Sequence, residues 1–496
     1  MEFARLIRSK TRVRFLLILA FTLLGFTVMG YHPGIEDDGV YLAAVNADLH
    51  PALYPHDSDF FRLQLQATLF DRWIADFVKV THIPVAWTEL LWQFLSLFAI
   101  LWGCYSIAEL LFAEERARWA GVAMVAAMFT LPVAGTALYL VDQHLHPRNV
   151  ATAIILFAIA RILGRKIWQA VLLLLVAFVL HPIMAAMGIS FSFFLAMCLK
   201  DPAPKWLRSL RGSMAAAVPL GWIFEPPTPA WRKALATRTY YYLYKWTWYE
   251  WLGALAPLLL FWILWRIAKK RGNDLLARFS LAVVIYGVFQ QIVAMIMLGP
   301  SVFLRLMPLQ PMRFLHLIYV FLALVAGCLI GKYLLKGKVW RWGLFLLVTN
   351  SGMYASQRAL FSGSDHLELP DRAPDNSWLQ AFTWIRQNTP TDAYFVLDPN
   401  YLAAPGEDYH SFRALAERSQ LADAIKDTAV VTQVPGLGPA WENQVDAQAG
   451  WSRFQLADFE RLRAQFGVNW ALVSYPQPVG LECSWHNGTL AVCRIP

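Results

Sequence analysis

Three consecutive acidic residues, Glu36, Asp37 and Asp38, directly follow the first apolar segment of the chain. Holding a carboxylate beside a lipid bilayer costs free energy, so such residues are usually paired with another group or have a function. Their oxygens bind hard divalent cations such as Mg²⁺ or Mn²⁺, and a single carboxylate can act as a general base. We therefore predict that Asp37 and Asp38 are catalytic, that the same pair could hold a divalent metal, and that Glu36 contacts substrate. The alternative is structural, because acidic residues also favour the start of a helix, here expected over 39–48.

A second polar segment, residues 141–149, is dense in ionisable side chains for a short turn between two apolar runs. Its spacing does not match a zinc site, and a plain interhelical turn would also need Pro and polar residues. We predict that it contributes to a binding site through Asp142, His144, His146 and Arg148. His181, which ends a later apolar run, favours an interfacial role instead.

Two further polar segments are basic. Residues 225–249 interleave Arg and Lys with Tyr and Trp, a pattern typical of an interfacial helix or of a site for an anionic lipid headgroup. Residues 299–313 contain two arginines, whose guanidinium groups bind phosphate oxygens well, although membrane-surface anchors would look the same. The candidate anion-binding residues are Arg238, Lys245, Arg305 and Arg313.

Composition indicates the elements that must position these segments. The 496 residues are 57% hydrophobic and only 16% charged, whereas about a quarter of the residues of soluble proteins are charged. This excludes a cytosolic enzyme and a disordered tail protein. Apolar runs near the length of about 20 residues that crosses a bilayer predict a multispanning helical bundle of about eleven helices. They lie near 13–30, 84–112, 119–140, 149–163, 168–181, 182–199, 213–224, 250–266, 279–298, 314–334 and 340–356.

Basic residues predict the orientation of this bundle. Short cytoplasmic loops are enriched in Lys and Arg, and alternate loops of the predicted bundle show this enrichment. The first apolar run reads as a retained helix rather than a cleaved signal. We therefore expect an integral protein of a bacterial inner membrane with a cytoplasmic N-terminus. Residues 1–356 would form the membrane domain, with outer loops 31–83, 141–149, 225–249 and 299–313, and residues 357–496 a periplasmic domain.

The C-terminal region differs in charge from the rest. From Arg358 onward it has 10 Lys or Arg and 16 Asp or Glu, a net charge of −6, against +15 for the preceding residues. The basic excess thus belongs to the membrane part and does not indicate nucleic acid as a partner. Alternating patterns predict a small α/β domain, with helices over 377–388, 412–426 and 455–466 and strands over 393–397, 430–434 and 470–474.

Two cysteines lie close together near the end of the chain. Cys483 and Cys493 flank Asn487-Gly488, a strong hairpin signal, so a hairpin would place them opposite each other. This predicts a disulfide, which needs an oxidising compartment. Two unpaired thiols are the alternative.

The layout resembles the C-type (GT-C) glycosyltransferases, multispanning enzymes that take a sugar from a polyprenyl-phosphate carrier on the outer face of the membrane. The resemblance rests on the acidic triplet after the first span, on Asp142 in a second polar outer loop, and on a soluble domain after the last span. It implies that Asp37 or Asp38 serves as base or metal ligand and that Arg305 or Arg313 binds phosphate. The Trp-Trp-Asp-Tyr-Gly type motif of oligosaccharyltransferases is absent from the sequence, which argues against glycan transfer to asparagine.

The expected function is transfer of a sugar from a polyprenyl-phosphate donor to an acceptor, with inversion at the anomeric carbon. A carboxylate would deprotonate or orient the acceptor hydroxyl, and arginine or a metal would neutralise the leaving phosphate. A transporter or flippase of an anionic lipid or solute is one alternative, because Glu89 and Glu109 lie in an apolar run. A non-catalytic envelope assembly protein is another.

Overall fold

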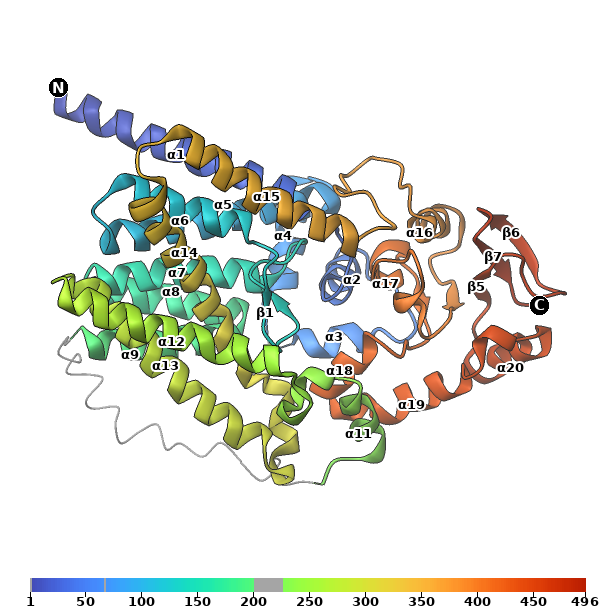
Figure 1. The fold of residues 1–496 in the computed structure, drawn as a ribbon. Coiled ribbons are helices and arrows are strands. Elements are labelled where there is room, and N and C mark those ends of the chain that lie inside the picture. Colours follow the sequence, from blue (N-terminus) through green and yellow to red (C-terminus); the bar gives the residue numbers. More distant parts are fainter. Residues whose placement is uncertain (1, 67, 200–225) are drawn as a thin grey trace.

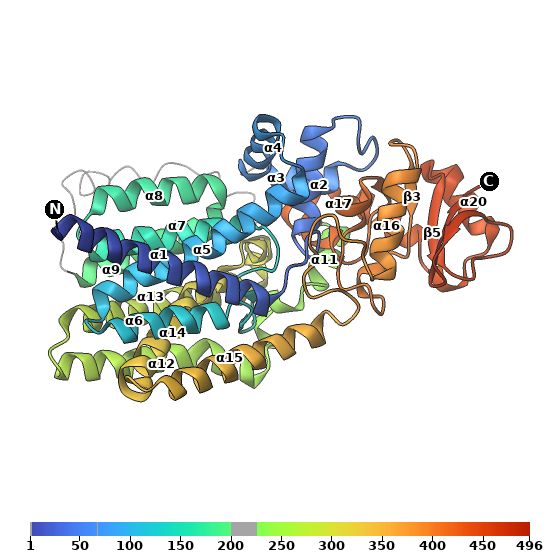
Figure 2. The same cartoon turned by 90° about the horizontal axis from the view of Figure 1, so that it is seen from above.

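A long helical bundle and a smaller mixed domain make up the molecule, with the N-terminus at the end of the bundle farthest from that domain (Figures 1 and 2). The computed structural model describes residues 2–66, 68–199 and 226–496. The C-terminal domain adjoins the other end of the bundle, here called the domain end. The α-helical bundle predicted from the sequence is confirmed, and the C-terminal domain, predicted as a small α/β domain, contains a small mixed sheet.

Five helical segments among the described residues are long and apolar enough to cross a membrane, which indicates an integral membrane protein. Two further apolar helices, α8 (Ile167–Leu180) and α9 (Pro182–Cys198), are shorter. Helices α6 (Glu115–Ala127), α7 (Pro147–Leu163) and α15 (Val339–Leu360) complete the bundle in Figure 1. The five long segments are Thr11–Met29 of α1 (Glu2–Met29), α5 (Val85–Leu111), α12 (Trp248–Lys270), α13 (Asp274–Leu298) and Pro311–Leu335, which contains α14 (Leu315–Ile330).

Among the described residues five helical segments are long enough to cross a membrane, against eleven spans predicted for the whole chain, and the span predicted over 119–140 is wrong in its second half. Helix α6 ends at Ala127, and the chain then forms a short antiparallel hairpin of β1 (Pro132–Val133) and β2 (Leu138–Tyr139). Pro132 has no N–H with which to continue a helix. Gly135 adopts a φ of +61° against the Trp246 ring, where no side chain fits. The span predicted over 213–224 lies outside the described residues.

Two His-Pro pairs begin helices at the domain end. His146 precedes α7 and its Nδ1 accepts a hydrogen bond from the Arg148 N–H at 2.9 Å. His181 precedes α9 and its Nδ1 accepts from the Met184 N–H at 3.3 Å. Proline suits the first helical position because its fixed φ is helical and its missing N–H is not needed there. Both histidines therefore cap a helix with one ring nitrogen, which leaves the other free for a different partner.

Short helices connect the bundle to the C-terminal domain. The acidic triplet is followed by α2 (Asp38–Leu49), so the helix expected there is present. Figure 2 shows α2, α3 and α4 between the bundle and the C-terminal domain. The other short elements on this side are α3 (Asp59–Leu65), α4 (Phe70–Thr81), α11 (Pro229–Ala236), η3 (Thr239–Tyr241), η4 (Leu243–Lys245), η5 (Ser301–Leu309) and η6 (Pro311–Phe314). The short helix η7 (Gly331–Leu335) follows α14 at the opposite end of the bundle, where Lys332 pairs with Glu114.

A five-stranded mixed sheet forms the core of the C-terminal domain, in the order β4-β3-β5-β7-β6. Strand β3 is parallel to β4 and β5, whereas β7 is antiparallel to β5 and β6. Alternate residues face opposite sides: Phe395 packs in the cluster with α16 and α17, and Val396 packs in the cluster with α20. The elements are α16 (Ser377–Asn388), β3 (Tyr394–Val396), η8 (Tyr401–Ala403), α17 (Phe412–Ala416), β4 (Ser419–Gln420), α18 (Asp427–Gln433), η9 (Pro435–Leu437), α19 (Gly438–Ala447), η10 (Trp451–Arg453), α20 (Leu456–Phe466), β5 (Trp470–Ser474), β6 (Glu482–His486) and β7 (Leu490–Arg494).

Two of the predicted elements in this domain are wrong. The helix expected over 412–426 ends after α17, because Glu417 adopts a left-handed φ of 54°. The strand expected over 430–434 is helical in α18, whose start is fixed by Asp423: its Oδ1 accepts from the Ile425 N–H at 2.8 Å. Val430 and Val431 favour strands by propensity, but here they are fully buried on one helix that packs into the core.

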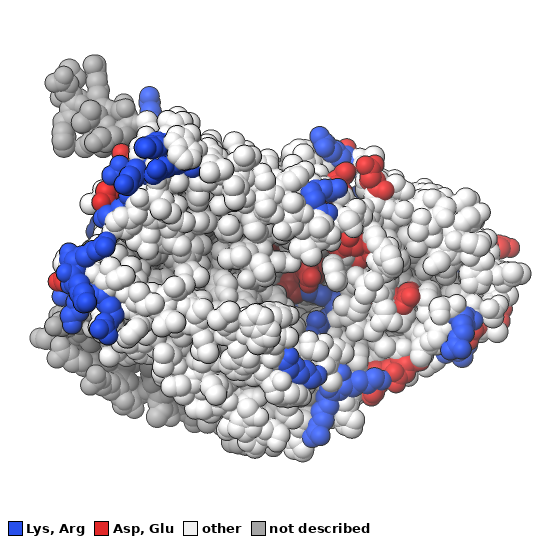
Figure 3. Space-filling model, in the orientation of Figure 1, with Lys and Arg blue, Asp and Glu red and all other residues white. Residues whose placement is uncertain are grey.

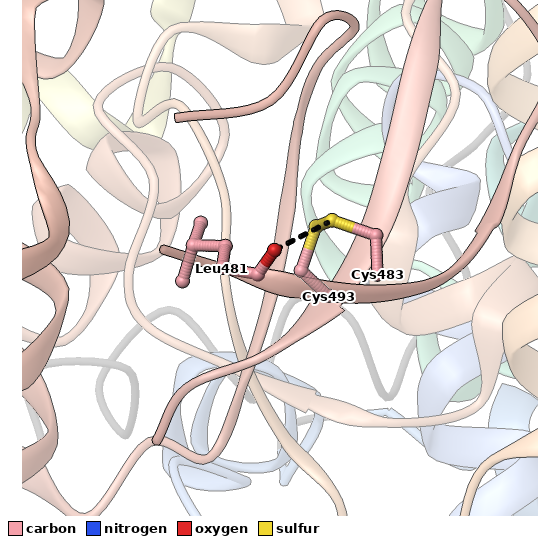
Figure 4. Close-up of a disulfide and its surroundings, with 3 residues drawn as sticks. All are labelled: Leu481, Cys483 and Cys493. Atoms are coloured by element: carbon pink, nitrogen blue, oxygen red, sulfur yellow. Dashed lines mark hydrogen bonds between the residues drawn. A yellow bond between two sulfur atoms is a disulfide. The ribbon is translucent and has the colours of Figure 1, made fainter. Parts of the chain in front are cut away.

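The hairpin of β6 and β7 places Cys483 opposite Cys493, and a disulfide joins them (Figure 4). The Leu481 carbonyl oxygen lies 3.8 Å from the Cys483 Sγ. We expect the double replacement of both cysteines by Ala to lower the stability of the domain by about 2–3 kcal/mol, as for other short disulfide loops. Thermal unfolding of the two proteins measures this difference. An unfolding midpoint of wild type that does not change on reduction would contradict a stabilising role.

Candidate functional site

A cavity of about 420 Å³ lies at the domain end, between the bundle and the C-terminal domain. The acidic loop (residues 31–38), the hairpin of β1 and β2, both His-Pro pairs, η3, η6 and α18 all contribute to its lining. Figure 3 shows acidic and basic side chains meeting on one face between the two parts of the molecule. The charged and imidazole side chains in the lining are Glu36, Asp37, His146, His181, Arg238, Arg313 and Lys426.

Asp37 is the aspartate of the acidic loop that lines this cavity. Its Oδ1 pairs with the Lys426 ammonium, its Oδ2 lies 3.5 Å from the His146 Nε2, and its side chain is 38% exposed. Burial raises the pKa of Asp37, but Lys426, His146 and Arg148 together outweigh burial and hold this pKa well below its ordinary value. Asp37 is therefore an ionised carboxylate that faces the cavity.

Asp38 has a different environment. Its side chain is buried, and its Oδ2 accepts a hydrogen bond from the Gly34 N–H at 2.6 Å, which closes a tight turn. Burial raises the pKa of Asp38 to about 7, with Asp37 and Asp142 nearby. Of the two aspartates predicted to be catalytic, the structure places Asp37 in the cavity and Asp38 beneath it, at the start of α2.

The second polar segment is a buried network of which His146 reaches the cavity. The Arg148 Nε donates to the Asp142 Oδ2 at 3.0 Å, and its Nη2 donates to Oδ1. Burial opposes ionisation of Asp142, but Arg148 and the two histidines lower the pKa of Asp142 below its ordinary value. Burial lowers the pKa of His144 to about 3, so this ring is neutral. The buried Asp142–Arg148 pair therefore lies next to His146, which is the residue of this network that lines the cavity.

The structure separates the four predicted anion-binding residues into two pairs. Arg238 and Arg313 line the cavity. Neither Nε atom has a hydrogen-bond partner within the described part of the chain, although both are buried. Arg305 packs over the Trp231 ring at 5.3 Å, and Lys245 packs over the Tyr242 ring at 4.8 Å, both away from the cavity lining. Arg238 and Arg313 thus have unused donors where an anionic group would enter.

Two cavity residues were missed by sequence reasoning. Lys426 lies just before α18 in the C-terminal domain, 389 residues from Asp37, and nothing local in its segment marks it. His181 was assigned to the membrane interface, yet its ring centroid lies 6.0 Å from that of His146. The shared His-Pro pattern at 146–147 and 181–182 is the signal that could have linked the two histidines.

The carboxylates do not form a donor set suited to a divalent metal. Asp37 is paired with Lys426, Asp142 with Arg148, and Asp38 with the Gly34 N–H. Among the described residues there is no group of three or more His, Cys, Asp or Glu side chains arranged to hold a metal ion. The residues present therefore do not fit the metal that the acidic triplet suggested.

The C-terminal part of the chain holds the acidic loop in place by backbone pairing. Tyr31 bridges Leu367 and Ile35 bridges His410. The Ser411 N–H donates to the Gly34 carbonyl at 2.9 Å. The acidic loop is thus a pair of turns held by isolated bridges between residues 366–368 and 409–411.

A buried carboxylate strengthens this pairing. Glu368 accepts from the His32 Nδ1 at 2.9 Å and from the His410 Nε2 at 3.0 Å. Burial opposes ionisation of Glu368, but His410 and His32 lower the pKa of Glu368 to about 2. The same carboxylate raises the pKa of His410 against the effect of burial. Glu368 therefore joins one histidine of the acidic loop to one of the C-terminal domain.

Replacing Glu368 by Gln should destabilise the protein at neutral pH by about 3 kcal/mol, because one partner of a buried ionic network is lost. The contribution of Glu368 is complete above its ordinary pKa of 4.5 and is lost as pH falls toward about 2. Thermal unfolding between pH 4 and 8 measures the difference, with the exposed Glu460→Gln as control. Equal midpoints for both variants would contradict the role assigned to Glu368.

Part of the C-terminal domain matches a family of known sequence. The family is described as "Domain of unknown function (DUF6798)" and covers residues 376–430, a stretch that includes Lys426. No curated protein matches this sequence.

Two solved structures are similar to this one over most of its length. The archaeal oligosaccharyltransferase AglB from Archaeoglobus fulgidus, in complex with an inhibitory peptide and a dolichol-phosphate, matches 94% of this chain and 70% of its own, with 11% identity and a TM-score of 0.48. The oligosaccharyltransferase of the same organism in complex with Zn and sulfate matches 92% of this chain and 68% of its own, with 11% identity and a TM-score of 0.45. At these values neither match assigns a residue role, a substrate or a metal to this chain.

Proposed function

We propose that this protein is a membrane glycosyltransferase that moves a sugar from a polyprenyl-phosphate carrier to an acceptor at the outer face of the membrane. One observation carries the proposal: an ionised carboxylate, Asp37, and two half-buried arginines, Arg238 and Arg313, line one cavity, and the Nε of each arginine has no hydrogen-bond partner among the described residues. Sugar transfer from a lipid phosphate needs the matching chemistry: a base for the hydroxyl of the acceptor molecule, and positive charge for the phosphate that leaves the donor.

The roles of the side chains follow from their positions. Asp37 would accept the proton of the acceptor hydroxyl, or orient that hydroxyl, as the acceptor oxygen attacks the anomeric carbon. Arg313 and Arg238 would bind the phosphate and stabilise the charge that develops as it leaves. Because the His146 Nδ1 accepts from a backbone N–H, its neutral ring carries the proton on Nε2, which faces Asp37. A single displacement of this kind inverts the configuration of the sugar.

The charge distribution supports the proposed orientation. Lys and Arg side chains gather at the end of the bundle opposite the C-terminal domain in Figure 3, and such enrichment is typical of the cytoplasmic side. The exposed aromatic residues Tyr244, Trp248 and Tyr249 lie at the domain end, where interfacial aromatic residues are expected. The disulfide of Cys483 and Cys493 suits an oxidising compartment on that same side.

Transport of an anionic lipid or solute is the second candidate function. Glu89 is 4% exposed within α5, and carboxylates inside spans often mark transport pathways. Glu109, by contrast, pairs with Arg14 at 2.7 Å. This ion pair gives Glu109 a structural role, so Glu89 is the residue that favours transport.

Proteoliposomes distinguish the two functions. The purified protein is supplied with polyprenyl-phosphate carrying a radiolabelled sugar and with a cell-envelope extract as acceptor source. The proposal predicts that label leaves the lipid and appears on a polar acceptor. Label that crosses the bilayer while it stays on its lipid would support a flippase, and label that neither moves nor transfers would support the assembly-protein hypothesis.

A further inference from the structure

We propose that Lys426 of the C-terminal domain supplies the positive charge at Asp37 that a divalent cation would otherwise supply. Lys426 would then be a positioning residue of the site, and the C-terminal domain would contribute directly to that site. The catalytic consequence rests on the proposed function, whereas the cation consequence rests on the contacts alone.

Both the ammonium group and the backbone N–H of Lys426 have bonding partners that fix its position. Its ammonium pairs with the Asp37 Oδ1, lies 3.9 Å from the Glu36 Oε2, and its side chain is 13% exposed. Its backbone N–H donates to the Asp423 Oδ1, and the next residue, Asp427, is held by Arg413 at 2.7 Å. The ammonium is therefore presented to the acidic loop by a buried and hydrogen-bonded turn, rather than by a mobile surface lysine.

A divalent ion at Asp37 would have to displace this ammonium. Of the other carboxylates nearby, Asp142 is held by Arg148 and Asp38 by the Gly34 N–H, which leaves Glu36, 56% exposed and 3.9 Å from the same ammonium, to offer a ligand in exchange. The ion would also lie in a cavity that Arg238 and Arg313 already make positive. The lysine has the advantage of a charge that is built into the fold and does not depend on metal concentration.

Lys426 also controls the protonation of Asp37. The groups that act on this carboxylate are Lys426, His146 and Arg148, which favour its ionised form, and burial, which opposes it. Glu36 and Asp38 on the same loop add negative charge, and Arg313 and Tyr41 are further neighbours. Removing Lys426 leaves burial less opposed, so the pKa of Asp37 rises, and Asp37 becomes protonated and inactive at a higher pH than in wild type.

Binding of Mn²⁺, followed by electron paramagnetic resonance on the purified full-length protein without substrate, tests the cation part. We expect wild type to show no Mn²⁺ binding that depends on Asp37, at Mn²⁺ concentrations up to about a hundredfold excess. Stoichiometric binding by wild type that is lost in Asp37→Asn would overturn the proposal. This result does not depend on finding a sugar substrate, so it stands even if the proposed function fails.

The pH profile of transfer tests the positioning part. In Lys426→Met, the activity relative to wild type should fall about a further tenfold between pH 8 and pH 5.5, whereas Lys426→Arg should keep the wild-type profile. Lys233→Met is the matched control, because Lys233 pairs with Asp446 outside the cavity. A parallel loss at every pH in Lys426→Met, with its thermal unfolding unchanged, would overturn the role of Lys426 in setting the charge of Asp37.

Discussion

Asp37→Asn should reduce sugar transfer by about a thousandfold, within the range expected when a general base is removed. Asparagine has nearly the same shape, so it keeps a neighbour for Lys426 and His146 but cannot take a proton. Initial rates of transfer in proteoliposomes measure the effect. Asp76→Asn is a suitable control, because the Asp76 side chain is 72% exposed on α4.

Asp38→Asn should behave differently, with transfer within about threefold of wild type. The Gly34 N–H needs an acceptor, and an amide oxygen can provide one. Because the pKa of Asp38 is raised to about 7 in the folded protein, its ionisation costs stability as pH rises from about 4 to 7. The stability of Asp38→Asn relative to wild type should therefore increase over this range. Similar rate losses for Asp37→Asn and Asp38→Asn would contradict the assignment of the base to Asp37.

Arg313→Gln should lower kcat/KM for the lipid-linked donor by about a hundredfold. Arg313 lines the cavity, its Nε has no hydrogen-bond partner in the part of the chain that the structure describes, and a charge-assisted bond to phosphate is worth about 1.5–3 kcal/mol. Because the bond strengthens as the phosphate leaves, kcat should fall as well as KM rise. Separate measurement of kcat and KM over a range of donor concentrations shows both effects.

Arg305→Gln is the informative comparison, since the sequence treats the two arginines alike. Arg305 packs over Trp231 and does not line the cavity, so its replacement should change kcat/KM by less than about threefold. A loss for Arg305→Gln equal to that for Arg313→Gln would mean that the phosphate does not bind where the structure places it.

Elements with a strong local pattern could be predicted from the sequence. The helix over 377–388 agrees with α16 at both ends, and the strand over 470–474 agrees with β5. Both have clear boundaries, an Asn cap in the first case and a buried apolar run in the second. The strand over 430–434 failed because valines that favour strands lie in a helix that the surrounding core buries. Tertiary packing outweighed intrinsic propensity there.

The site was predictable only where its residues are close in sequence. The acidic triplet and the turn over 141–149 were found from local density of charge, and the structure brings Asp37 and His146 together. Lys426 was not found, because its importance comes from a contact 389 residues away. Arg413, within the helix expected over 412–426, is buried and pairs with Asp427. Long-range pairing leaves no periodic signal in one sequence.

The pairing of the acidic loop with residues 366–368 and 409–411 has a consequence for the order of events during synthesis. The membrane helices enter the bilayer from the N-terminus onward, so Asp37 reaches its side of the membrane long before Lys426 and His410 have been translated. Until the middle third of the C-terminal domain has been translocated and folded, the carboxylate has neither its partner charge nor its full backbone support. A nascent or truncated chain would therefore bind donor lipid poorly. The protein would become able to catalyse transfer only late in its biogenesis.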